Sequence, residues 1–327
     1  MILTVGTTFS GIGAPEQALK NLGIQFVTKW ACDIKKSSKE TYLSNHTCEK
    51  FYDDITKIDI NSLEYVDLYV FGFPCQDCSI VGKQDLNGGR TALVQYSLDI
   101  IDKIKPKYIL FENVFNLLNK KFEKFFRGIK ENLESNYNFD YRILNSIDFG
   151  VPQSRRRVFG IGIRKDLKQL PDFNLPVLPR VNIELILESN VLQSFYLSQE
   201  KQDKIVEIAK EMVKDFQLQP KIGIVNGVNK FNKTSIFSKI KIQYKDYCSC
   251  LNLIDLFGII DANHNIRTLT PREYARLQGF PDSFILHKNN NTAYKQFGNT
   301  ITVNVLESIF KKMFLKSLTI SKFFDNL

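Results

Sequence analysis

The chain has 327 residues, 43% of them hydrophobic and 24% charged, with a formal net charge of +9 and a pI near 9.1. This length and composition predict a globular protein with a substantial core and two lobes, and they exclude a low-complexity or repeat protein. The basic charge suits a polyanionic partner, although Lys- and Asn-rich chains are also basic for compositional reasons alone.

No segment has the pattern of a signal peptide or a membrane span, so the six cysteines predict free thiols in a reducing compartment, the cytoplasm. Two cysteine pairs could suggest other chemistry. Cys75-x-x-Cys78 lacks the helix start of a redox pair, and Cys248-x-Cys250 is too closely spaced for usual zinc knuckles. We therefore predict no metal site.

The first predicted unit is a strand at Leu3–Phe9, a loop containing Gly11 and Gly13, and a helix. Glycines let a ligand approach the backbone, and the helix N-terminus then faces that ligand. A second predicted strand, Gln25–Ala31, is followed by Asp33, twenty residues after Gly13. An acid at this offset binds ribose hydroxyls in nucleotide-binding α/β folds. Asp33 alone could equally be a solvated carboxylate, but the combination predicts an adenosine-containing ligand.

An apolar run, Val66–Phe71, predicts a fully buried strand that Gly72 and Pro74 end. Cys75 then lies on a stiff loop just past the carboxyl end of the strand, where open α/β sheets place their chemistry. A cysteine displayed in this way is a candidate nucleophile. The alternative is a small buried residue in a tight turn.

The glycine-containing loop at 80–90 has the composition of a mobile lid, and a helix is expected at Ser97–Ile104. The next buried strand, Lys107–Phe111, brings Glu112 to the same sheet edge as Cys75. A carboxyl group in apolar surroundings favours its neutral form, which can donate a hydrogen bond. A solvated strand-end glutamate is the alternative.

After a predicted amphipathic helix at Phe122–Leu133, a polar segment holds Gln153, Arg155 and Arg157 before another apolar strand. If that strand alternates, Arg155 and Arg157 share one face. Two guanidinium groups on one face suit phosphate or a base carbonyl, whereas a surface charge run is the simpler alternative.

Prolines at 171, 176 and 179 mark a change of lobe, which continues with a predicted helix at Glu200–Phe216. Basic, amide and aromatic side chains interleave over 221–247, as in surfaces that contact nucleic acid, although a Lys/Asn-rich loop would look the same. Farther on, Thr270, Pro271 and Glu273 predict a capped helix start. The segment Gln296–Ile301 leads into an apolar helix that we expect to return to the first lobe.

Taken in order, these segments resemble the motifs of the cytosine-C5 DNA methyltransferases of bacterial or phage modification systems, over nearly the whole chain. FSGIG resembles the methyl-donor loop and GFPCQDCS the catalytic loop, while ENV and QSRRR resemble the motifs that hold the base. RTLTPREYARLQGFPD and FGNTI resemble the two closing motifs. Each motif is modest alone, but six in order are close to decisive.

The resemblance implies a chemical role for each catalytic candidate. The thiolate of Cys75 would add to C6 of a flipped-out cytosine. Glu112 would hold the N3/N4 edge of the base, and Arg157 its carbonyl. Arg155 would organise the phosphate and the Cys75 loop, and Gln153 belongs to the same motif.

The resemblance also implies S-adenosylmethionine as the methyl donor. The residues expected around it are Phe9, Gly11, Ile12, Gly13, Asp33, Asp54, Ile55, Phe73, Pro74, Leu93, Asn299 and Ile301. The residues expected at the DNA are Ser79, Val81, Lys230, Lys233, Lys239 and Arg272.

Several positions depart from the family pattern. Asp33 stands where a glutamate is usual, and Lys35 where an acid is frequent. Cys78 replaces an aromatic residue, and Val81 would enter the space left by the flipped base. The family's Thr-Leu pair is degraded to Ser249-Cys250-Leu251. These changes affect rate and base flipping rather than the reaction.

We therefore predict an α/β protein with a doubly wound, mostly parallel sheet: a catalytic and cofactor-binding domain at 1–175, a target-recognition domain at 176–285 and a returning segment at 286–327. The expected substrate is a short sequence in double-stranded DNA, modified by a monomer that has no membrane partner, and a cognate restriction endonuclease is a compatible partner. A tRNA-directed enzyme of the same family and an inactive DNA-binding homologue are the alternatives.

Overall fold

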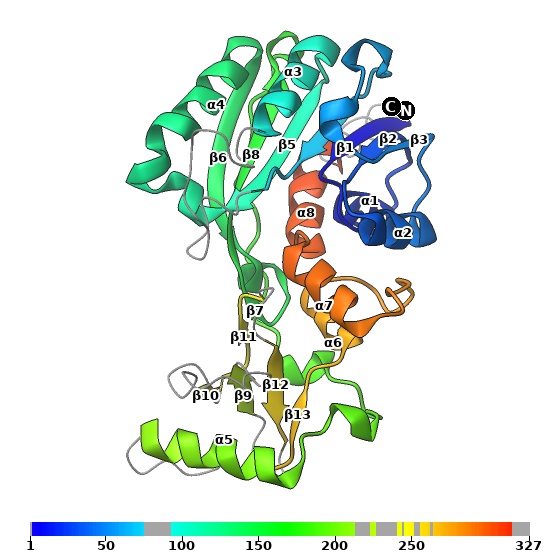
Figure 1. Ribbon diagram of the computed structural model, residues 1–327. Coiled ribbons are helices and arrows are strands. Elements are labelled where there is room, and N and C mark those ends of the chain that lie inside the picture. Colours follow the sequence, from blue (N-terminus) through cyan, green and yellow to red (C-terminus); the bar gives the residue numbers. More distant parts are fainter. Residues whose placement is uncertain are drawn as a thin grey trace, which may run out of the picture. The chain divides into compact units, whose positions relative to one another are not determined.

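The computed structural model describes residues 2–74, 93–212, 223–226, 241–243, 245–251, 256–261 and 264–315 (Figure 1). The chain forms two compact units. The first consists of Met1–Asn145, Arg156–Val177 and Thr300–Leu327, and the second of Ser146–Arg155 and Leu178–Asn299. Within the described residues, no helix is long and apolar enough to span a membrane.

A seven-stranded sheet in the order β3-β2-β1-β4-β5-β8-β6 forms the centre of the first unit. The strands from β3 to β5 pair in parallel, whereas β8 is antiparallel to both β5 and β6. This arrangement confirms the predicted mostly parallel α/β sheet. The strand bounds are β1 Leu3–Thr8, β2 Phe26–Cys32, β3 Lys50–Tyr52, β4 Leu68–Phe71, β5 Tyr108–Val114, β6 Tyr137–Asn145 and β8 Arg156–Arg164.

The strand order reverses between β1 and β4, because β2 and β3 extend the sheet in one direction and β5 in the other. The crevice at the carboxyl ends of two such strands is the usual ligand site of an open α/β sheet. The glycine loop (Phe9–Gly13) follows β1, and the segment that leads to Cys75 follows β4. The topology thus places both predicted functional loops at the same edge of the sheet.

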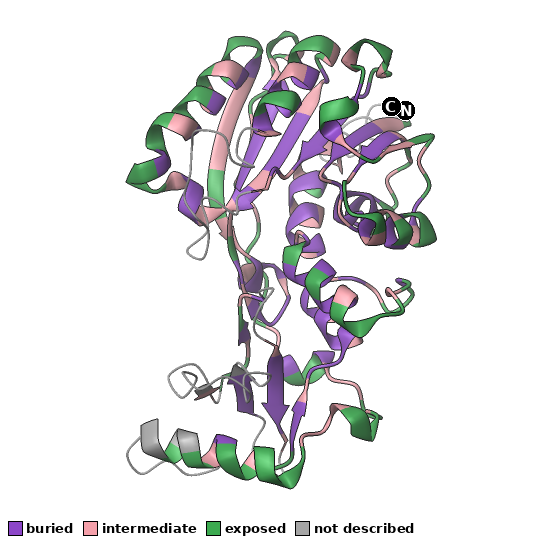
Figure 2. Cartoon of the chain, in the orientation of Figure 1, coloured by how far each residue is buried: buried purple, intermediate pink, exposed green. Residues whose placement is uncertain are grey.

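The central strands of the first unit are largely buried (Figure 2). Aromatic side chains on these adjacent strands form the core, and Tyr69, Phe71 and Phe111 are fully buried. Apolar residues of two helices join this core, including Leu98 of α3 and Phe126 of α4. The helix α8 instead packs against α1. The helix bounds are α1 Ala14–Asn21, α2 Lys36–Asn45, α3 Val94–Ile104, α4 Glu123–Asn136 and α8 Val303–Phe310, which a π-helix at Lys311–Leu315 continues.

One strand is longer than its apolar pattern predicts. The sequence suggests that the strand ends at Phe111, but β5 continues through Glu112 and Asn113 to Val114. The reason is the pairing with β8, which extends from Tyr108↔Ile163 to Val114↔Arg157. The side chain of Glu112 is therefore held by a strand rather than by a loop.

The second unit is built around a four-stranded antiparallel sheet, β10-β9-β12-β13, with a small core of Ile205, Val225, Ile260 and Ile266. A separate two-stranded pair joins β7 to β11. The strands are β7 Gln153–Ser154, β9 Gly223–Asn226, β10 Lys241–Gln243, β11 Cys248–Ser249, β12 Phe257–Ile260 and β13 Ile266–Thr268. The helices are α5 Gln199–Met212, α6 Pro271–Leu277 and α7 Asn290–Asn299.

The predicted capping box at the start of α6 is confirmed. The Thr270 hydroxyl accepts from the Glu273 backbone amide over 3.2 Å, and Glu273 Oε2 accepts from the Thr270 amide over 2.7 Å. Glu273 is fully buried and also forms a bidentate ion pair with Arg267, at 2.6 and 2.8 Å. This pair joins the last strand of the small sheet to the helix that follows it.

The two units differ from the three predicted segments at two places. Ser146–Arg155 belongs to the second unit, because β7 pairs with β11 there. Residues 286–299, predicted to return to the catalytic domain, also stay in the second unit, because α7 packs against α6. The main change of unit, at Val177 and Leu178, lies within the proline-marked break.

Candidate active site

The glycine loop turns sharply after β1. Phe9, Gly11 and Gly13 all have positive φ angles, of 55°, 57° and 83°. A non-glycine residue such as Phe9 adopts this region rarely, and such positions cluster at ligand-binding sites. The backbone amide of Gly11 donates to Asp33 Oδ2 over 2.9 Å. The structure thus brings together the loop and the acid that the sequence predicts to share a ligand.

Asp33 lies at the end of β2, where its second carboxylate oxygen accepts from the Lys35 backbone amide over 2.8 Å. Burial raises the pKa of Asp33, and the two backbone hydrogen bonds, together with the charge of Lys35, oppose that rise. The carboxylate is consequently fixed in direction by backbone groups on both sides.

Four of the predicted cofactor residues gather in one apolar region. Ile55 and Phe73 are buried in the central hydrophobic cluster, and Phe9 and Leu93 pack against it. Asp54, just before Ile55, caps a short 3-10 helix at Ile55–Lys57 by accepting from the Thr56 amide and hydroxyl. These two hydrogen bonds lower the pKa of Asp54. Of the remaining positions in the first unit, Ile12 is buried, whereas Pro74 and Ile301 are partly buried.

Glu112 and Arg157 meet across the antiparallel strands β5 and β8. Arg157 Nε lies 3.2 Å from Glu112 Oε1, and the two side chains are 15% and 12% exposed. A side chain built on Gly72, just after β4, would contact Glu112 Oε2 at 3.8 Å. The carboxylate therefore lies beside the backbone that leads toward Cys75.

Asn113, the residue after Glu112 on β5, holds the backbone between β4 and Cys75. Its buried side-chain amide donates to the carbonyl oxygen of Phe73 over 3.1 Å, and its side-chain oxygen accepts from the Val114 amide over 2.8 Å. The sequence places Asn113 in a motif but predicts no role for it. No local signal could have indicated this contact, because the two residues are forty positions apart.

Cys75, Ser79 and Val81 lie outside the described residues, as do Lys230, Lys233 and Lys239. The lid predicted at 80–90 also lies outside them. These positions therefore remain predictions.

Gln153 and Arg155 lie in the second unit. The Gln153 side chain is fully buried, donating to the Leu277 carbonyl over 2.9 Å and accepting from the Leu251 amide over 3.0 Å. Arg155 is 3% exposed, and its guanidinium donates to the Leu251 carbonyl over 3.3 Å and to Cys250 Sγ over 3.4 Å. Both residues thus contact the segment at Cys250 and Leu251.

The condition under which Arg155 and Arg157 would share one strand face is not met. The strand β8 begins at Arg156, and Arg155 lies in the break between β7 and β8, so strand alternation does not extend to it. Arg156 is exposed, and its guanidinium lies 5.0 Å from the centre of the Phe115 ring. The three consecutive arginines accordingly have three different environments.

Two further predicted site residues, Arg272 and Asn299, lie in the described part of the second unit. Arg272 donates to the carbonyl oxygens of Pro281 and Phe284, at 3.2 and 2.9 Å, so its guanidinium stabilises the loop after α6. Asn299 is the exposed last residue of α7. Among the residues that the structure describes, no cluster of His, Cys, Asp or Glu could hold a metal ion.

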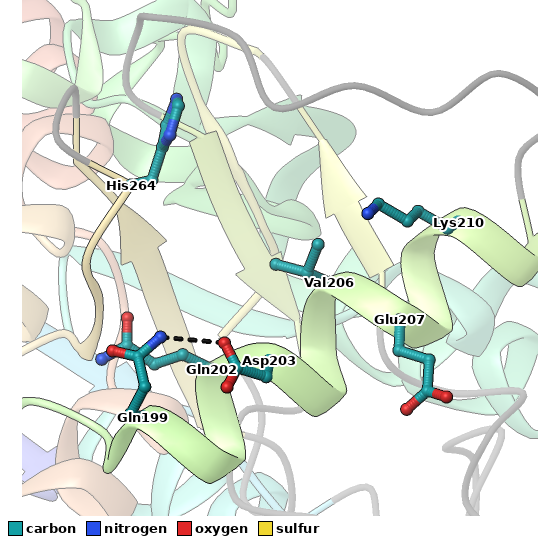
Figure 3. Close-up of a pocket in the computed structure, with 7 residues that line it drawn as sticks. All are labelled: Gln199, Gln202, Asp203, Val206, Glu207, Lys210 and His264. Atoms are coloured by element: carbon teal, nitrogen blue, oxygen red, sulfur yellow. Dashed lines mark hydrogen bonds between the residues drawn. The ribbon is translucent and has the colours of Figure 1, made fainter.

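An open pocket of about 700 Å³ lies along α5 in the second unit (Figure 3). Its side chains carry both charges, and a hydrogen bond of 2.8 Å from Gln199 to Asp203 runs along its wall. It contains no predicted site residue, and its volume alone gives it no chemical role. It is lined by Gln199, Gln202, Asp203, Val206, Glu207, Lys210 and His264.

Comparison with known proteins identifies the family. The family model described as C-5 cytosine-specific DNA methylase matches residues 3–315. The type II methyltransferase M.DsaV of Dactylococcopsis salina is 33% identical over 311 residues, which cover 93% of this chain and 84% of that protein. The type II methyltransferase M.HhaI of Haemophilus parahaemolyticus is 30% identical over 306 residues, covering 92% and 91%.

Solved structures agree on the fold. The Entamoeba histolytica methyltransferase EhMeth superposes with a TM-score of 0.72 at 21% identity, covering 97% of this chain and 99% of that one. A mutant of Spodoptera frugiperda DNMT2 gives a TM-score of 0.69 at 21% identity, covering 94% and 98%. The chain belongs to the C-5 cytosine-specific DNA methylase family, and it is a cytosine-5 methyltransferase.

Proposed function

We propose that this enzyme transfers a methyl group from S-adenosylmethionine to C5 of a flipped-out cytosine in a short duplex DNA sequence, through a covalent bond between Cys75 and C6. One observation carries the proposal. The Glu112–Arg157 pair lies beside Gly72, at the sheet edge where the chain continues from β4 toward Cys75. A base bound to this pair would present its ring to the Cys75 loop.

Glu112 would bind the N3/N4 edge of the cytosine, and the Arg157 guanidinium would bind the base carbonyl. A proton held at N3 by Glu112 withdraws electrons from the ring, so that C6 accepts a nucleophile. Because the two side chains already contact each other at 3.2 Å, both would turn toward the base without a change in the strands that carry them. Asn113 would keep the start of the Cys75 loop in register with that base.

The thiolate of Cys75 would form the Sγ–C6 bond, which opens the 5,6 double bond and makes C5 nucleophilic. C5 would then take the electrophilic methyl group of S-adenosylmethionine as the S–CH3 bond breaks, and the thioether S-adenosylhomocysteine would leave with that electron pair. Loss of the C5 proton to a base and cleavage of the Sγ–C6 bond then restore the double bond and release the thiolate. The target must leave the helix first, because C6 is inaccessible in a stacked duplex.

The residues present fit the proposed cofactor. The glycine loop offers close backbone approach, and Asp33 offers a carboxylate oriented by Gly11 and Lys35. The apolar cluster around Ile55 and Phe73 is suited to an adenine ring. In this proposal the polar groups follow β1 and β2, and the apolar residues Ile55 and Phe73 follow β3 and β4.

Duplex DNA is the proposed substrate because the curated relatives named above are type II methyltransferases. The second unit would then read the target sequence, with the basic and aromatic stretch at 221–247 as its contact to phosphates. A monomer in the cytoplasm, working beside a restriction endonuclease for the same site, fits that substrate.

The test is incubation of the purified enzyme with tritiated S-adenosylmethionine and either unmethylated genomic DNA or tRNA, followed by base-resolution mapping of 5-methylcytosine. We expect label at C5 within one short DNA context. Label in tRNA alone would show that tRNA, and not DNA, is the substrate. Label in neither nucleic acid would contradict the proposed activity.

The covalent step has its own test. In DNA that carries 5-fluorocytosine at the mapped site, fluorine replaces the proton that must leave C5, so the adduct should persist as a band that resists denaturation. Cys75→Ala should form no such band, whereas Cys48→Ala, which alters a cysteine outside the proposed site, should form it as the parent enzyme does. A persistent adduct with Cys75→Ala would exclude Cys75 as the nucleophile.

A further inference from the structure

A buried polar cluster (Thr7, Glu16, Tyr42 and His46) lies against the glycine loop. Glu16, in the first turn of α1, and Tyr42, on α2, are both completely buried. The Tyr42 hydroxyl donates to Glu16 Oε1 over 2.7 Å, and the Thr7 hydroxyl donates to the same oxygen over 3.3 Å. The carboxyl group therefore joins α2 to the end of β1.

The hydrogen bonds continue into the loop itself. The Thr7 and Ser10 hydroxyls lie 2.7 Å apart, and Ser10 also bonds to the backbone of Cys32 at the end of β2. A continuous chain of contacts thus runs from Tyr42 through Glu16 and Thr7 to Ser10. Each step is between side chains that are at least nine-tenths buried.

His46 supports the other end of the loop. A Cβ atom at Gly13 would lie too close to His46 Cδ2 and 3.2 Å from Tyr42 Cδ2. The two rings therefore occupy the space that a side chain at position 13 would need. The His46 backbone amide donates to the Tyr42 carbonyl over 2.8 Å at the end of α2, and the two ring centres are 5.3 Å apart. Helix α2 consequently presents one aromatic surface to the loop and one hydroxyl to Glu16.

We propose that Tyr42 and His46 are positioning residues that hold the glycine loop in its cofactor-binding conformation, through Glu16 and Gly13 respectively. The inference rests on the proposed function, in which this loop binds S-adenosylmethionine. It makes α2 a determinant of cofactor affinity that acts through the loop.

The chemistry of the cluster favours this role over simple packing. Burying a carboxyl group and a phenol costs free energy that apolar side chains of similar size would avoid. Burial raises the pKa of Glu16, and the hydrogen bonds from Tyr42 and Thr7 oppose that rise. The contacts of the cluster converge on the loop from α1, α2 and β1, which is the geometry expected of a support.

The experiment compares Tyr42→Phe, which removes only the hydroxyl, with Tyr96→Phe, which alters a partly exposed tyrosine on α3. Calorimetry gives the Kd for S-adenosylmethionine, and steady-state assays separate KM for the cofactor from kcat. Tyr42→Phe should raise both Kd and KM roughly tenfold, the loss expected for one hydrogen bond to a buried group. At saturating cofactor, kcat should stay close to that of Tyr96→Phe, because the catalytic groups are unchanged.

Glu16→Gln keeps an oxygen acceptor for the Tyr42 hydroxyl and should bind the cofactor nearly as tightly as the parent enzyme, whereas Glu16→Leu should match Tyr42→Phe. Unchanged Kd in Tyr42→Phe and Glu16→Leu, with the parent enzyme binding normally, would overturn the positioning role alone. A fall in kcat without a change in KM would also overturn it. If the parent enzyme itself bound no S-adenosylmethionine, the proposed function would fail instead.

Discussion

Arg157 lies 3.2 Å from Glu112, with its strand β8 antiparallel to β5, which carries Glu112. The pair is positioned by strand pairing rather than by a loop, since Val114 and Arg157 are direct partners in the register. The backbone of paired strands usually moves little when a ligand binds. Strand pairing therefore already fixes the backbone of the two groups that we propose to hold the base.

Glu112→Gln should lower kcat for methyl transfer by about 10²-fold or more, because an amide cannot supply the proton that activates C6. Tritium release from C5 measures this rate directly. Glu131→Gln, a change on the surface of α4, is the matched control and should leave the rate within about twofold. Equal rates for the two variants would remove Glu112 from the chemistry.

Asn113→Ala should reduce kcat while leaving the Kd for S-adenosylmethionine nearly unchanged. The change removes the hydrogen bond to the Phe73 carbonyl and leaves a buried acceptor unsatisfied, a loss of about 1–3 kcal/mol. If the contact orients the Cys75 loop, adduct formation with 5-fluorocytosine DNA should slow by a similar factor to kcat. Adduct formation at the parent rate would show that Asn113 acts elsewhere.

Gly13→Ala should destabilise the protein and abolish measurable cofactor binding. Alanine at φ 83° costs about 1–2 kcal/mol, and the contact with the His46 ring adds about 1–3 kcal/mol of overpacking. Gly23→Ala is the control, because Gly23 has a φ of 66° with no atom within 4 Å of the new Cβ. Urea denaturation should therefore separate the two variants by the overpacking contribution. If they lost equal stability, the contact with His46 would carry no energy.

Stability should fall as the pH decreases from about 6.5 to about 4, in part because of His46. Burial, the first cause, and the charge of Lys20 lower the pKa of this histidine from 6.5 to about 4, against a hydrogen bond to the Ile12 backbone. The unfolded chain therefore takes up a proton on His46 at a higher pH than the folded protein does. This difference contributes up to about 3 kcal/mol to the free energy of unfolding, which is fully present above pH 6.5 and is lost by pH 4.

Glu16 has the opposite sign, since its raised pKa favours the folded state at low pH, and the neighbouring Cys48 stays a thiol throughout because burial raises its pKa to about 11. The measurement is therefore the difference in urea midpoint between pH 7 and pH 4.5 for the parent protein and for His46→Asn. The variant should lose less stability over this interval. An identical loss would show that His46 does not titrate as its burial indicates.

Local patterns were sufficient to predict much of the first unit. The glycine loop and Asp33 were predicted from spacing, and the structure joins them by a 2.9 Å hydrogen bond. The capping box at Thr270 is likewise a local motif, and its two hydrogen bonds are present. Such features depend on residues close in sequence, or on the fixed geometry of a strand–loop–helix unit.

Contacts between distant segments were not predictable in the same way. The extension of β5 through Glu112 depends on β8, more than forty residues later, and the separation of Arg155 from Arg157 depends on the segment at Cys250 and Leu251. The Glu16 cluster likewise needs three elements to be packed together before its hydrogen bonds exist. No local pattern in a single sequence predicts contacts between segments so far apart.

The packing of α8 against α1 has a consequence for how the chain is made. Asn21, at the end of α1, donates to Glu307 of α8 over 2.6 Å, so the support of the first helix is encoded close to the end of the described chain. During synthesis the N-terminal segment leaves the ribosome long before α8 is made. The apolar surface of α1 that α8 covers therefore stays exposed while the whole second unit is translated. Most of the second unit, Leu178–Asn299, is contiguous and can fold in that interval. The order of completion on the ribosome would then be the reverse of the order in the sequence, with the first unit finished last.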